Sequence, residues 1–277
     1  MRKFRIVLIH SFLFVLFTIL TQIGGIVWLL CIPLLNYIKR HVLHKIQRWI
    51  AYVLGPSLIY LIVTFSVIPL LASLWGRVPL PVTNVSLRPL TLMTVLLNRH
   101  YVRKELRNVV LETSAQMAEK FPGTFVCYLD AGFPFINGFP LLPHLSHNDG
   151  RKLDLAFFYK DAVTQQPVTD TPSPIGYGIC EEPALNEENT AVYCASKGYW
   201  QYSLLQKIIP QGNKNDYIFD SQRTKAIIQL LAQHKRIGKI FIEPHLKKRM
   251  HLIAYNKIRF HGCQAVRHDD HIHIQLP

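Results

Sequence analysis

The sequence predicts N-terminal transmembrane helices followed by an α+β domain with a small antiparallel sheet. Three observations lead to this fold class. Two long apolar runs occupy the first 76 residues. No Asp or Glu occurs before Glu105, so all 17 acidic residues lie in the rest of the 277-residue chain. Near the C-terminus, Ile272, Ile274 and Leu276 alternate with polar residues, which is the pattern of a strand with one buried face.

The first apolar run, residues 6–38, contains no Lys, Arg, Asp or Glu. A helix needs about 20 residues to cross the hydrocarbon core, so these 33 residues exceed one span. Residues 49–75 are a second uncharged run of membrane length. The alternatives are a buried helical hairpin and a cleaved signal peptide, whose apolar region is shorter, roughly 7–15 residues. Residues 1–76 are therefore expected to be a transmembrane anchor of two or three membrane segments.

Basic residues stand on both sides of the first run. They are Arg2, Lys3 and Arg5 before it, and Lys39, Arg40, Lys45 and Arg48 between the two runs. Basic loops favour the cytoplasm, and a single span cannot place both clusters there. Either the 39–48 loop decides the orientation, or the first run doubles back near Gly24 and Gly25. In both cases we expect a protein of the inner (cytoplasmic) membrane whose residues 77–277 face the periplasm or the cell exterior.

Cysteine usage fits an oxidising compartment. Cys31 lies in the apolar run, which leaves Cys127, Cys180, Cys194 and Cys263. An even number fits two disulfides, with three possible connectivities. Cys180 and Cys194 flank an acidic, loop-like stretch and are the expected pair, whereas four unpaired thiols are the alternative. CxxC spacing does not occur, so a cysteine-zinc site is not expected.

The outer part of the chain is expected to comprise a linker and helix over residues 77–124 and a second domain over residues 125–277. Pro79, Pro81 and Pro89 indicate a linker over residues 77–92. Periodicity and turn residues predict helices over 99–121 and 221–234, and strands over 125–129, 152–159, 239–242 and 267–276. Residues 160–198 contain four prolines, which predict a long irregular insertion.

Histidine and aspartate gather in two segments. The first holds His144, His147 and Asp154, and the second holds His268, Asp269, Asp270, His271 and His273. In a strand, His271 and His273 share a face because they are two residues apart. Catalytic zinc typically has three protein ligands, with imidazole and carboxylate among the suitable ones, and an open position for water. The alternatives are structural histidines, or a solvated tail with incidental metal affinity.

Two motifs in these segments resemble a known family. His147-Asn-Asp-Gly-Arg-Lys-Leu-Asp154 resembles the HxxGxxxD element of the metallopeptidase clan that holds D-Ala-D-Ala peptidases and lysostaphin-type enzymes. His268-Asp-Asp-His-Ile-His273 resembles its HxH element, most closely the version in penicillin-insensitive murein endopeptidases. Those also have a His three residues before the first ligand, where His144 stands here, and residues 239–248 are similar to a strand and turn of that family. The resemblance covers about residues 125–277, with an insertion between its halves.

The resemblance implies that residues 125–277 are a zinc metallopeptidase-like domain. His147, Asp154 and His273 would be the ligands of Zn²⁺, and Gly150 would permit the tight loop between the first two.

The resemblance also implies the residues around the metal. His271 would be the general base or transition-state stabiliser, and His144 and His268 would line the site. Some relatives have a catalytic Glu at the position of 268 or 270, where this chain has none, so Asp270 is the expected substitute.

The implied reaction is hydrolysis of an amide. An outward-facing domain with 24 basic and 17 acidic residues in 77–277 would meet peptidoglycan, whose peptides carry carboxylates. Arg151 and Lys152 are candidates to bind those carboxylates, or are simply solvated loop charges. A membrane-anchored endopeptidase or carboxypeptidase of peptidoglycan peptides is therefore expected. The alternatives are a zinc hydrolase of another envelope amide and a non-catalytic metal-binding or wall-binding membrane protein. Nucleic-acid binding is not expected, because the basic residues form no interleaved aromatic pattern and the favoured topology puts the domain outside.

Overall fold

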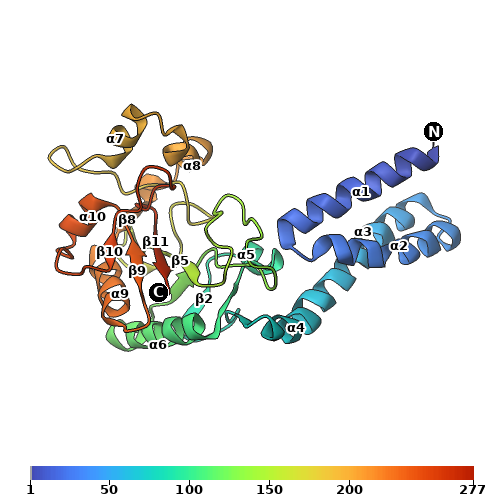
Figure 1. Cartoon of the computed structure of the whole chain (residues 1–277), viewed down its shortest axis with the longest axis horizontal. Helices are drawn as coiled ribbons and strands as arrows, with labels where there is room; N and C mark the ends of the chain where they lie inside the picture. Colours follow the sequence, from blue (N-terminus) through green and yellow to red (C-terminus); the bar gives the residue numbers. More distant parts are fainter. Residues whose placement is uncertain (1) are drawn as a thin grey trace.

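The computed structural model describes residues 2–277, as a bundle of apolar helices joined to a mixed α/β domain (Figure 1). The helices of the bundle are α1 (Arg2–Thr21), α2 (Gly24–His41), α3 (Lys45–Ile62) and α4 (Ile68–Leu74). A π-helical turn, Val63–Val67, joins α3 to α4 without a break. The first apolar run is thus two helices.

The chain doubles back between α1 and α2, where Thr21 and two glycines make a close turn. The Gly24 N–H donates to Thr21 Oγ1 at 2.8 Å. A Cβ on Gly25 would lie 2.0 Å from Thr18 Oγ1 and 2.5 Å from the Phe14 carbonyl oxygen, so only glycine permits this approach. The start of α1 and the α2–α3 connection both lie at the end of the bundle farthest from the domain (Figure 1). Both basic clusters of the sequence therefore belong to the same end.

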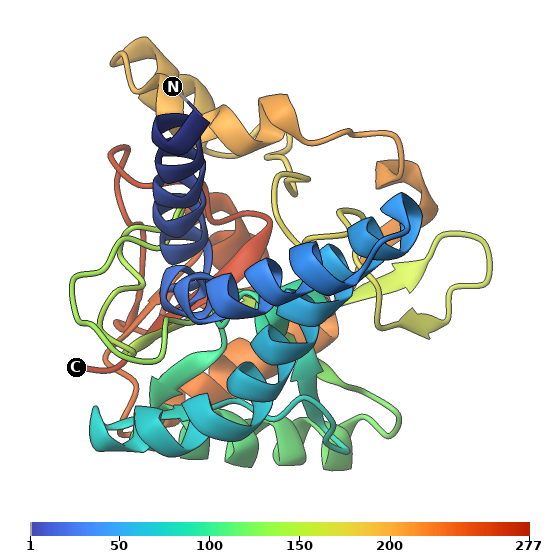
Figure 2. The same ribbon diagram turned by 90° about the vertical axis from the view of Figure 1, so that its right-hand side faces the viewer.

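Two stretches of the bundle, Phe4–Thr21 and Lys45–Leu74, are long and apolar enough to cross a membrane. In their most apolar windows only 6% and 17% of the residues are buried inside the molecule, unlike in the core helix of a soluble protein. Figure 2 views the bundle from its own side, with α2 and α3 running alongside each other and α1 at an angle to them. The chain therefore has two candidate membrane-spanning helices.

A six-stranded sheet forms the centre of the domain, in the order β10-β9-β11-β5-β4-β2. Its four inner strands are antiparallel, and each edge strand runs parallel to its neighbour. The strands are β2 (Leu87–Pro89), β4 (Val126–Tyr128), β5 (Lys152–Ala156), β9 (Lys239–Phe241), β10 (Ile258–Arg259) and β11 (His271–Gln275). The expected α+β region with an antiparallel sheet is thus present, and the parallel edges make the sheet mixed.

Helices α6 (Lys104–Lys120) and α9 (Ser221–Gln233) cover one face of this sheet (Figure 1). Their apolar sides pack on Leu153, Leu155, Ile272 and Ile274 in the main hydrophobic core. Because side chains alternate along a strand, the residues between these four project from the opposite face.

A cap lies over that opposite face (Figure 1). It consists of α7 (Thr190–Ser196), a 3-10 turn (Trp200–Ser203) and α8 (Leu204–Ile208). The smaller elements are β1 (Arg77–Pro79) paired with β3 (Tyr101–Arg103), the sheet of β6 (Tyr159–Asp161), β7 (Pro167–Val168) and β8 (Tyr217–Phe219), helices α5 (Leu92–Leu96) and α10 (Pro244–Arg249), and a 3-10 turn (Lys214–Asp216).

Some elements differ from the sequence-based prediction. Residues 77–92, expected to be a linker, contain β1 and β2, and β2 pairs with β4 in the central sheet. The helix expected from residue 99 begins at Lys104, because 101–103 form β3. The strand expected over 152–159 is interrupted after Ala156, where the chain leaves the central sheet for the small one.

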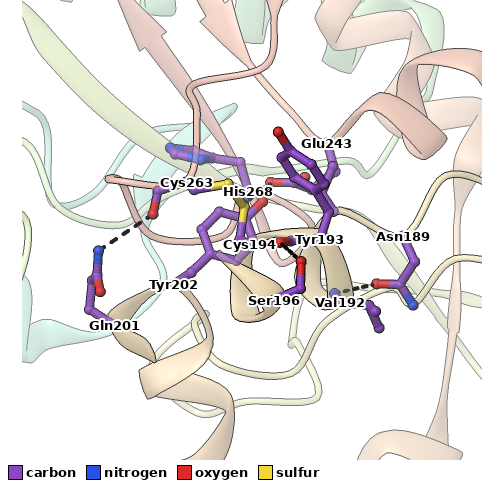
Figure 3. The surroundings of a disulfide bond; sticks show 11 residues. Asn189, Val192, Tyr193, Cys194, Ser196, Gln201, Tyr202, Glu243, Cys263 and His268 are labelled. Atoms are coloured by element: carbon purple, nitrogen blue, oxygen red, sulfur yellow. Dashed lines mark hydrogen bonds between the residues drawn. A yellow bond between two sulfur atoms is a disulfide. The ribbon is translucent and has the colours of Figure 1, made fainter. Parts of the chain in front are cut away.

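The expected Cys180–Cys194 disulfide is wrong, because Cys194 is bonded to Cys263 (Figure 3). Helix α7 carries Cys194 against the 260–266 loop. Cys180 is held elsewhere, since the next residue, Glu181, donates its N–H to the carbonyl of Asp269 at 2.7 Å. Among the described residues Cys31, Cys127 and Cys180 are free and buried, so one disulfide is present where two were expected.

Candidate metal centre

Strands β5 and β11 bring the two histidine-rich segments together. Their register places His273 directly opposite Asp154. His271 and His273 share the face that turns away from helices α6 and α9, because Ile272 between them is in the core. The alternation predicted for the terminal strand is confirmed, and it explains why this face of the sheet is polar.

His147 comes from the loop before β5. Its Nδ1 donates to the carbonyl of Ala131 at 2.8 Å, which orients the ring. Gly150 follows with a φ of +73°, in the left-handed region that favours glycine, and lets the loop turn into β5. The ring Nε2 of His147 then points at the β5–β11 pair.

His147, Asp154 and His273 form one group, whose ligand atoms all lie within 4.8 Å of one another. Asp154 Oδ1 is 2.8 Å from His273 Nδ1 and 3.3 Å from His147 Nε2. The two imidazole nitrogens are 3.1 Å apart. All three side chains are buried, so these donor atoms converge at metal-binding distance away from bulk solvent.

The three converging atoms, His147 Nε2, Asp154 Oδ1 and His273 Nδ1, suit a bound cation better than they suit hydrogen bonds to one another. A carbonyl oxygen only accepts, so His147 Nδ1 carries the proton and its Nε2 is a lone pair. Asp154 Oδ1 also accepts. The single proton that His273 Nδ1 can hold does not satisfy both acceptors. Two imidazoles and one carboxylate are a common ligand set of catalytic zinc, which keeps a fourth position open.

The pKa values describe the same crowding of charge. Burial would raise the pKa of Asp154, but His147 and His271 hold it well below its usual range. Burial lowers the pKa of His273 to about 4, despite the hydrogen bond to Asp154. An ionised Asp154 beside a neutral His273 is the protonation state in which these two groups can bind a metal.

His271 stands next to this group, with its Nε2 3.7 Å from Asp154 Oδ1. Its Nδ1 donates to Asp270 Oδ1, and Asp270 Oδ2 accepts the N–H of Gly178 at 2.6 Å. Burial would lower the pKa of His271, but Asp154 and Asp270 outweigh it and raise the pKa to about 9. A cation bound by Asp154 would offset part of that negative charge and bring the pKa down again.

A cavity of about 510 Å³ opens onto the group between the sheet and the cap. Six residues predicted for the site line it: His144, His147, Asp154, His268, His271 and His273. Asp270 does not, because its carboxylate is turned toward His271 and Gly178. Arg151 and Lys152 are also outside the lining, and Lys152 pairs with Asp149 at 3.0 Å.

His144 and His268 have different surroundings within the cavity. His144 Nδ1 donates to Asp130 Oδ2 at 2.9 Å, and its Nε2 is buried without a hydrogen-bond partner in residues 2–277. Burial and the neighbouring His271 and His273 hold the pKa of His268 well below its usual range, so it is neutral near pH 7.

Sequence reasoning missed Tyr177, Asp130 and His261. The Tyr177 hydroxyl donates to Asp154 Oδ2 at 2.8 Å, and His261 lines the cavity with its ring stacked 6.1 Å from that of His273. Tyr177 lies in the irregular insertion and His261 is isolated, so no motif marked them. Asp130 directly follows the predicted strand 125–129, and this position at a strand end was the one available signal.

Comparison with known proteins adds no assignment, because no protein-family model and no curated protein matches the chain. The geometry of the site therefore carries the functional argument.

Proposed function

We propose that the protein is a membrane-anchored, zinc-dependent amidohydrolase that cleaves peptide bonds of peptidoglycan. The observation that carries the proposal is the convergence of His147 Nε2, Asp154 Oδ1 and His273 Nδ1 beneath a cavity lined by four further imidazoles. The spacing of these residues in the sequence, which resembles that of zinc endopeptidases, supports the same reaction class.

His147, Asp154 and His273 hold the metal in this proposal. Zinc supplies polarisation of the substrate carbonyl and activation of a water molecule. Two histidines and a carboxylate are also a donor set of iron(II) oxygenases, so the identity of the metal is a direct test. The Ala131 carbonyl and the Tyr177 hydroxyl fix the first two ligands through hydrogen bonds.

His271 is the proposed general base. It takes a proton from the attacking water at Nε2 and passes it to the leaving amine nitrogen. Its Nδ1–H is held by Asp270, which orients the ring as a carboxylate orients the histidine of a hydrolytic triad. Asp270 is thus a positioning residue, which differs from the expectation that it replaces a catalytic Glu.

His144 and His268 are the proposed substrate-binding imidazoles. Because Asp130 accepts the proton on His144 Nδ1, the Nε2 of that ring is free to accept from a substrate amide N–H. The neutral ring of His268 offers one donor to the substrate carbonyl without a charge of its own. These contacts place the scissile bond over the metal group.

The substrate and compartment follow from the anchor and from charge. If α1, α2 and the α3–α4 helix all cross the bilayer, the basic residues near the N-terminus and around the α2–α3 connection lie in the cytoplasm together. The domain then faces the periplasm or cell exterior, where a basic surface attracts the anionic cell wall. The disulfide between Cys194 and Cys263 agrees with that compartment.

The test uses the full chain purified in detergent. We expect about one zinc per chain by elemental analysis, and cleavage of peptide bonds in purified sacculi, measured as newly formed amino groups. His273→Ala should lose both the zinc and the activity. His234→Ala is the matched control, because that histidine follows α9 on the far face of the sheet and does not line the cavity. A His273→Ala protein equal to wild type in zinc content and digestion would contradict the proposal.

The same assay separates the alternatives. A protein that holds zinc and leaves sacculi intact while hydrolysing other envelope amides is a zinc hydrolase of different substrate. Zinc without turnover of any amide would support a non-catalytic metal-binding or wall-binding protein. The orientation of Asp270 away from the cavity is the observation that favours this last reading.

A further inference from the structure

The loop of residues 133–148, which carries His144 and His147, contains no helix or strand. A metal ligand on such a loop needs support from outside it, because binding is weakened whenever the ligand is displaced. One hydrogen bond closes the loop internally, from the Gly138 N–H to the Asn148 carbonyl at 2.9 Å. Other contacts from outside hold single residues of the loop, such as the Ala131 carbonyl at His147 and Arg99 at the carbonyl of Leu142. Arg77, by contrast, bonds to both ends of the loop.

Arg77 is completely buried, at 0% exposure, and its guanidinium bonds to both ends of the loop. It donates to the carbonyl of Phe133 at the start and, at 3.1 Å, to the carbonyl of Asn148 at the end. It also donates to Asn137 Oδ1 at 2.6 Å. These contacts span the segment that contains both site histidines.

The partners of Arg77 are unusual for a buried cation. Among residues 2–277 no carboxylate forms an ion pair with it. Arg223, which is also buried but lies on the far side of the domain, pairs with Asp220 at 2.7 Å. Burial and the nearby Arg103 lower the pKa of Arg77 to about 10, so it is charged at neutral pH. A buried charge is costly unless its donors are satisfied. Loop oxygens accept from both terminal nitrogens of Arg77, whereas its buried Nε has no hydrogen-bond partner in residues 2–277.

Arg77 also has a particular place in the chain, three residues after the end of α4. Two further contacts join the loop to the helical bundle. Gln22 Oε1, in the α1–α2 turn, accepts the N–H of Phe135 at 2.8 Å, and the rings of Trp75 and Phe135 pack edge-to-face at 5.1 Å. The loop is therefore attached to the exit of the candidate membrane helix.

We propose that Arg77 is a positioning residue, which fixes the 133–148 loop to the end of α4 and thereby holds His147 at the metal. The consequence for metal binding rests on the proposed function, whereas the fixing of the loop does not. The helical bundle is then part of the support of the site as well as an anchor.

The experiment compares Arg77→Met, Arg77→Lys and Arg223→Met with wild type, as full chains in detergent. Hydrogen exchange of the metal-free proteins should show the fastest exchange in residues 133–148 for Arg77→Met. Chelator competition should show zinc binding weakened about 10- to 100-fold, the range for residues that orient metal ligands. Arg77→Lys, which keeps the charge and some donors, should lie between. Arg223→Met should lower the melting temperature and leave loop exchange and zinc affinity unchanged.

Each outcome bears on one claim. A folded Arg77→Met protein with wild-type exchange in residues 133–148 overturns the proposal. If that variant does not fold, Asn137→Ala removes one exposed acceptor and should still speed exchange and weaken zinc binding, and a wild-type result for it overturns the proposal as well. If wild type binds no zinc, the proposed function fails, and the exchange measurement still decides the role of Arg77.

Discussion

The hydroxyl of Tyr177 bridges two carboxyl-bearing residues of the candidate site. It donates to Asp154 Oδ2 at 2.8 Å and accepts the backbone N–H of Asp130 at 3.1 Å. Burial and the charges of Asp130 and Asp154 raise the pKa of Tyr177 well above its usual range, so it remains a donor at any ordinary pH. It therefore holds the carboxylate so that Oδ1 faces the two imidazoles.

Tyr177→Phe should weaken zinc binding by about tenfold, because the oriented oxygen of Asp154 loses its partner. It should also lower the free energy of unfolding by about 1–3 kcal/mol, the cost of leaving buried polar groups unpaired. Chelator competition and urea unfolding measure the two effects. Tyr202→Phe is the matched control, since that buried hydroxyl bonds Glu243 at 2.6 Å outside the metal group. Equal zinc affinity in Tyr177→Phe and wild type would contradict the role of the hydroxyl.

His100 makes stability depend on pH independently of the metal. Burial lowers its pKa to about 4, from 6.5 in the unfolded chain. Between those values the unfolded chain takes up a proton that the folded chain does not, so stability falls as the pH drops from 6.5 to 4. The shift corresponds to a loss of up to about 3 kcal/mol. Between pH 7 and pH 4, the free energy of unfolding of His100→Gln should fall less than that of wild type. Equal falls in the two proteins would contradict this.

The candidate metal ligands were predictable because two sequence patterns coincide with them. The spacing of His147 and Asp154 and the alternation around His273 are both properties of short segments. Arg77 and Tyr177 were not predictable, because each acts on residues more than 20 positions away through contacts that only the folded chain creates. A lone buried arginine or tyrosine has no pattern of its own in a sequence.

At the scale of elements, the cap is joined to the 260–266 loop, which also lines the cavity. Cys194 of α7 is bonded to Cys263, and Gln201 donates to the Cys263 carbonyl at 3.5 Å (Figure 3). Beneath them Glu243 accepts from Tyr202 and from the backbone N–H of His268. The cap contributes Gln201, Leu204 and Leu205 to the cavity lining, and no metal ligand.

The double variant Cys194→Ser/Cys263→Ser should therefore affect the cavity more than the metal. Removing a cross-link between residues 69 apart should cost roughly 2–4 kcal/mol of stability. Zinc affinity should be unchanged, whereas KM for wall peptides should rise because the cap is less firmly held. Urea unfolding, chelator competition and kinetics test this. Reduced wild type is the control and should match the variant, and a variant as stable as oxidised wild type would contradict the prediction.

Sequence reasoning worked for elements with a strong period and failed for the cap. Helix α9 and strands β4, β9 and β11 lie within the predicted ranges because their apolar residues recur at helix or strand spacing. The cap lacks such a period and is shaped by long-range contacts, among them the disulfide. That is also why Cys180, the cysteine nearest to Cys194 in the sequence, was wrongly predicted as its partner in place of Cys263.

At the scale of the whole molecule, the helical hairpin would set the orientation that the proposed function requires. If α1, α2 and the α3–α4 helix all cross the bilayer, the α2–α3 connection and the domain lie on opposite sides of it. In intact cells, a membrane-impermeant thiol reagent should label Leu185→Cys, whose side chain is fully exposed near the cap, and should leave His44→Cys in the α2–α3 connection unlabelled. Labelling of both sites after the cells are opened is the control. The reverse pattern would contradict the proposed orientation.

The pairing of β5 with β11 also means that the residues of the candidate site are synthesised at different times. Asp154 and its partner His273 are 119 positions apart, and the cap and α9 are made between them. In the proposed topology the domain leaves the cytoplasm in the order of its synthesis. His147 and Asp154 would then cross the membrane before β11, so the three candidate ligands would come together only outside the cytoplasm. In that topology, a metal bound by the three residues would be drawn from the ions of the outer compartment.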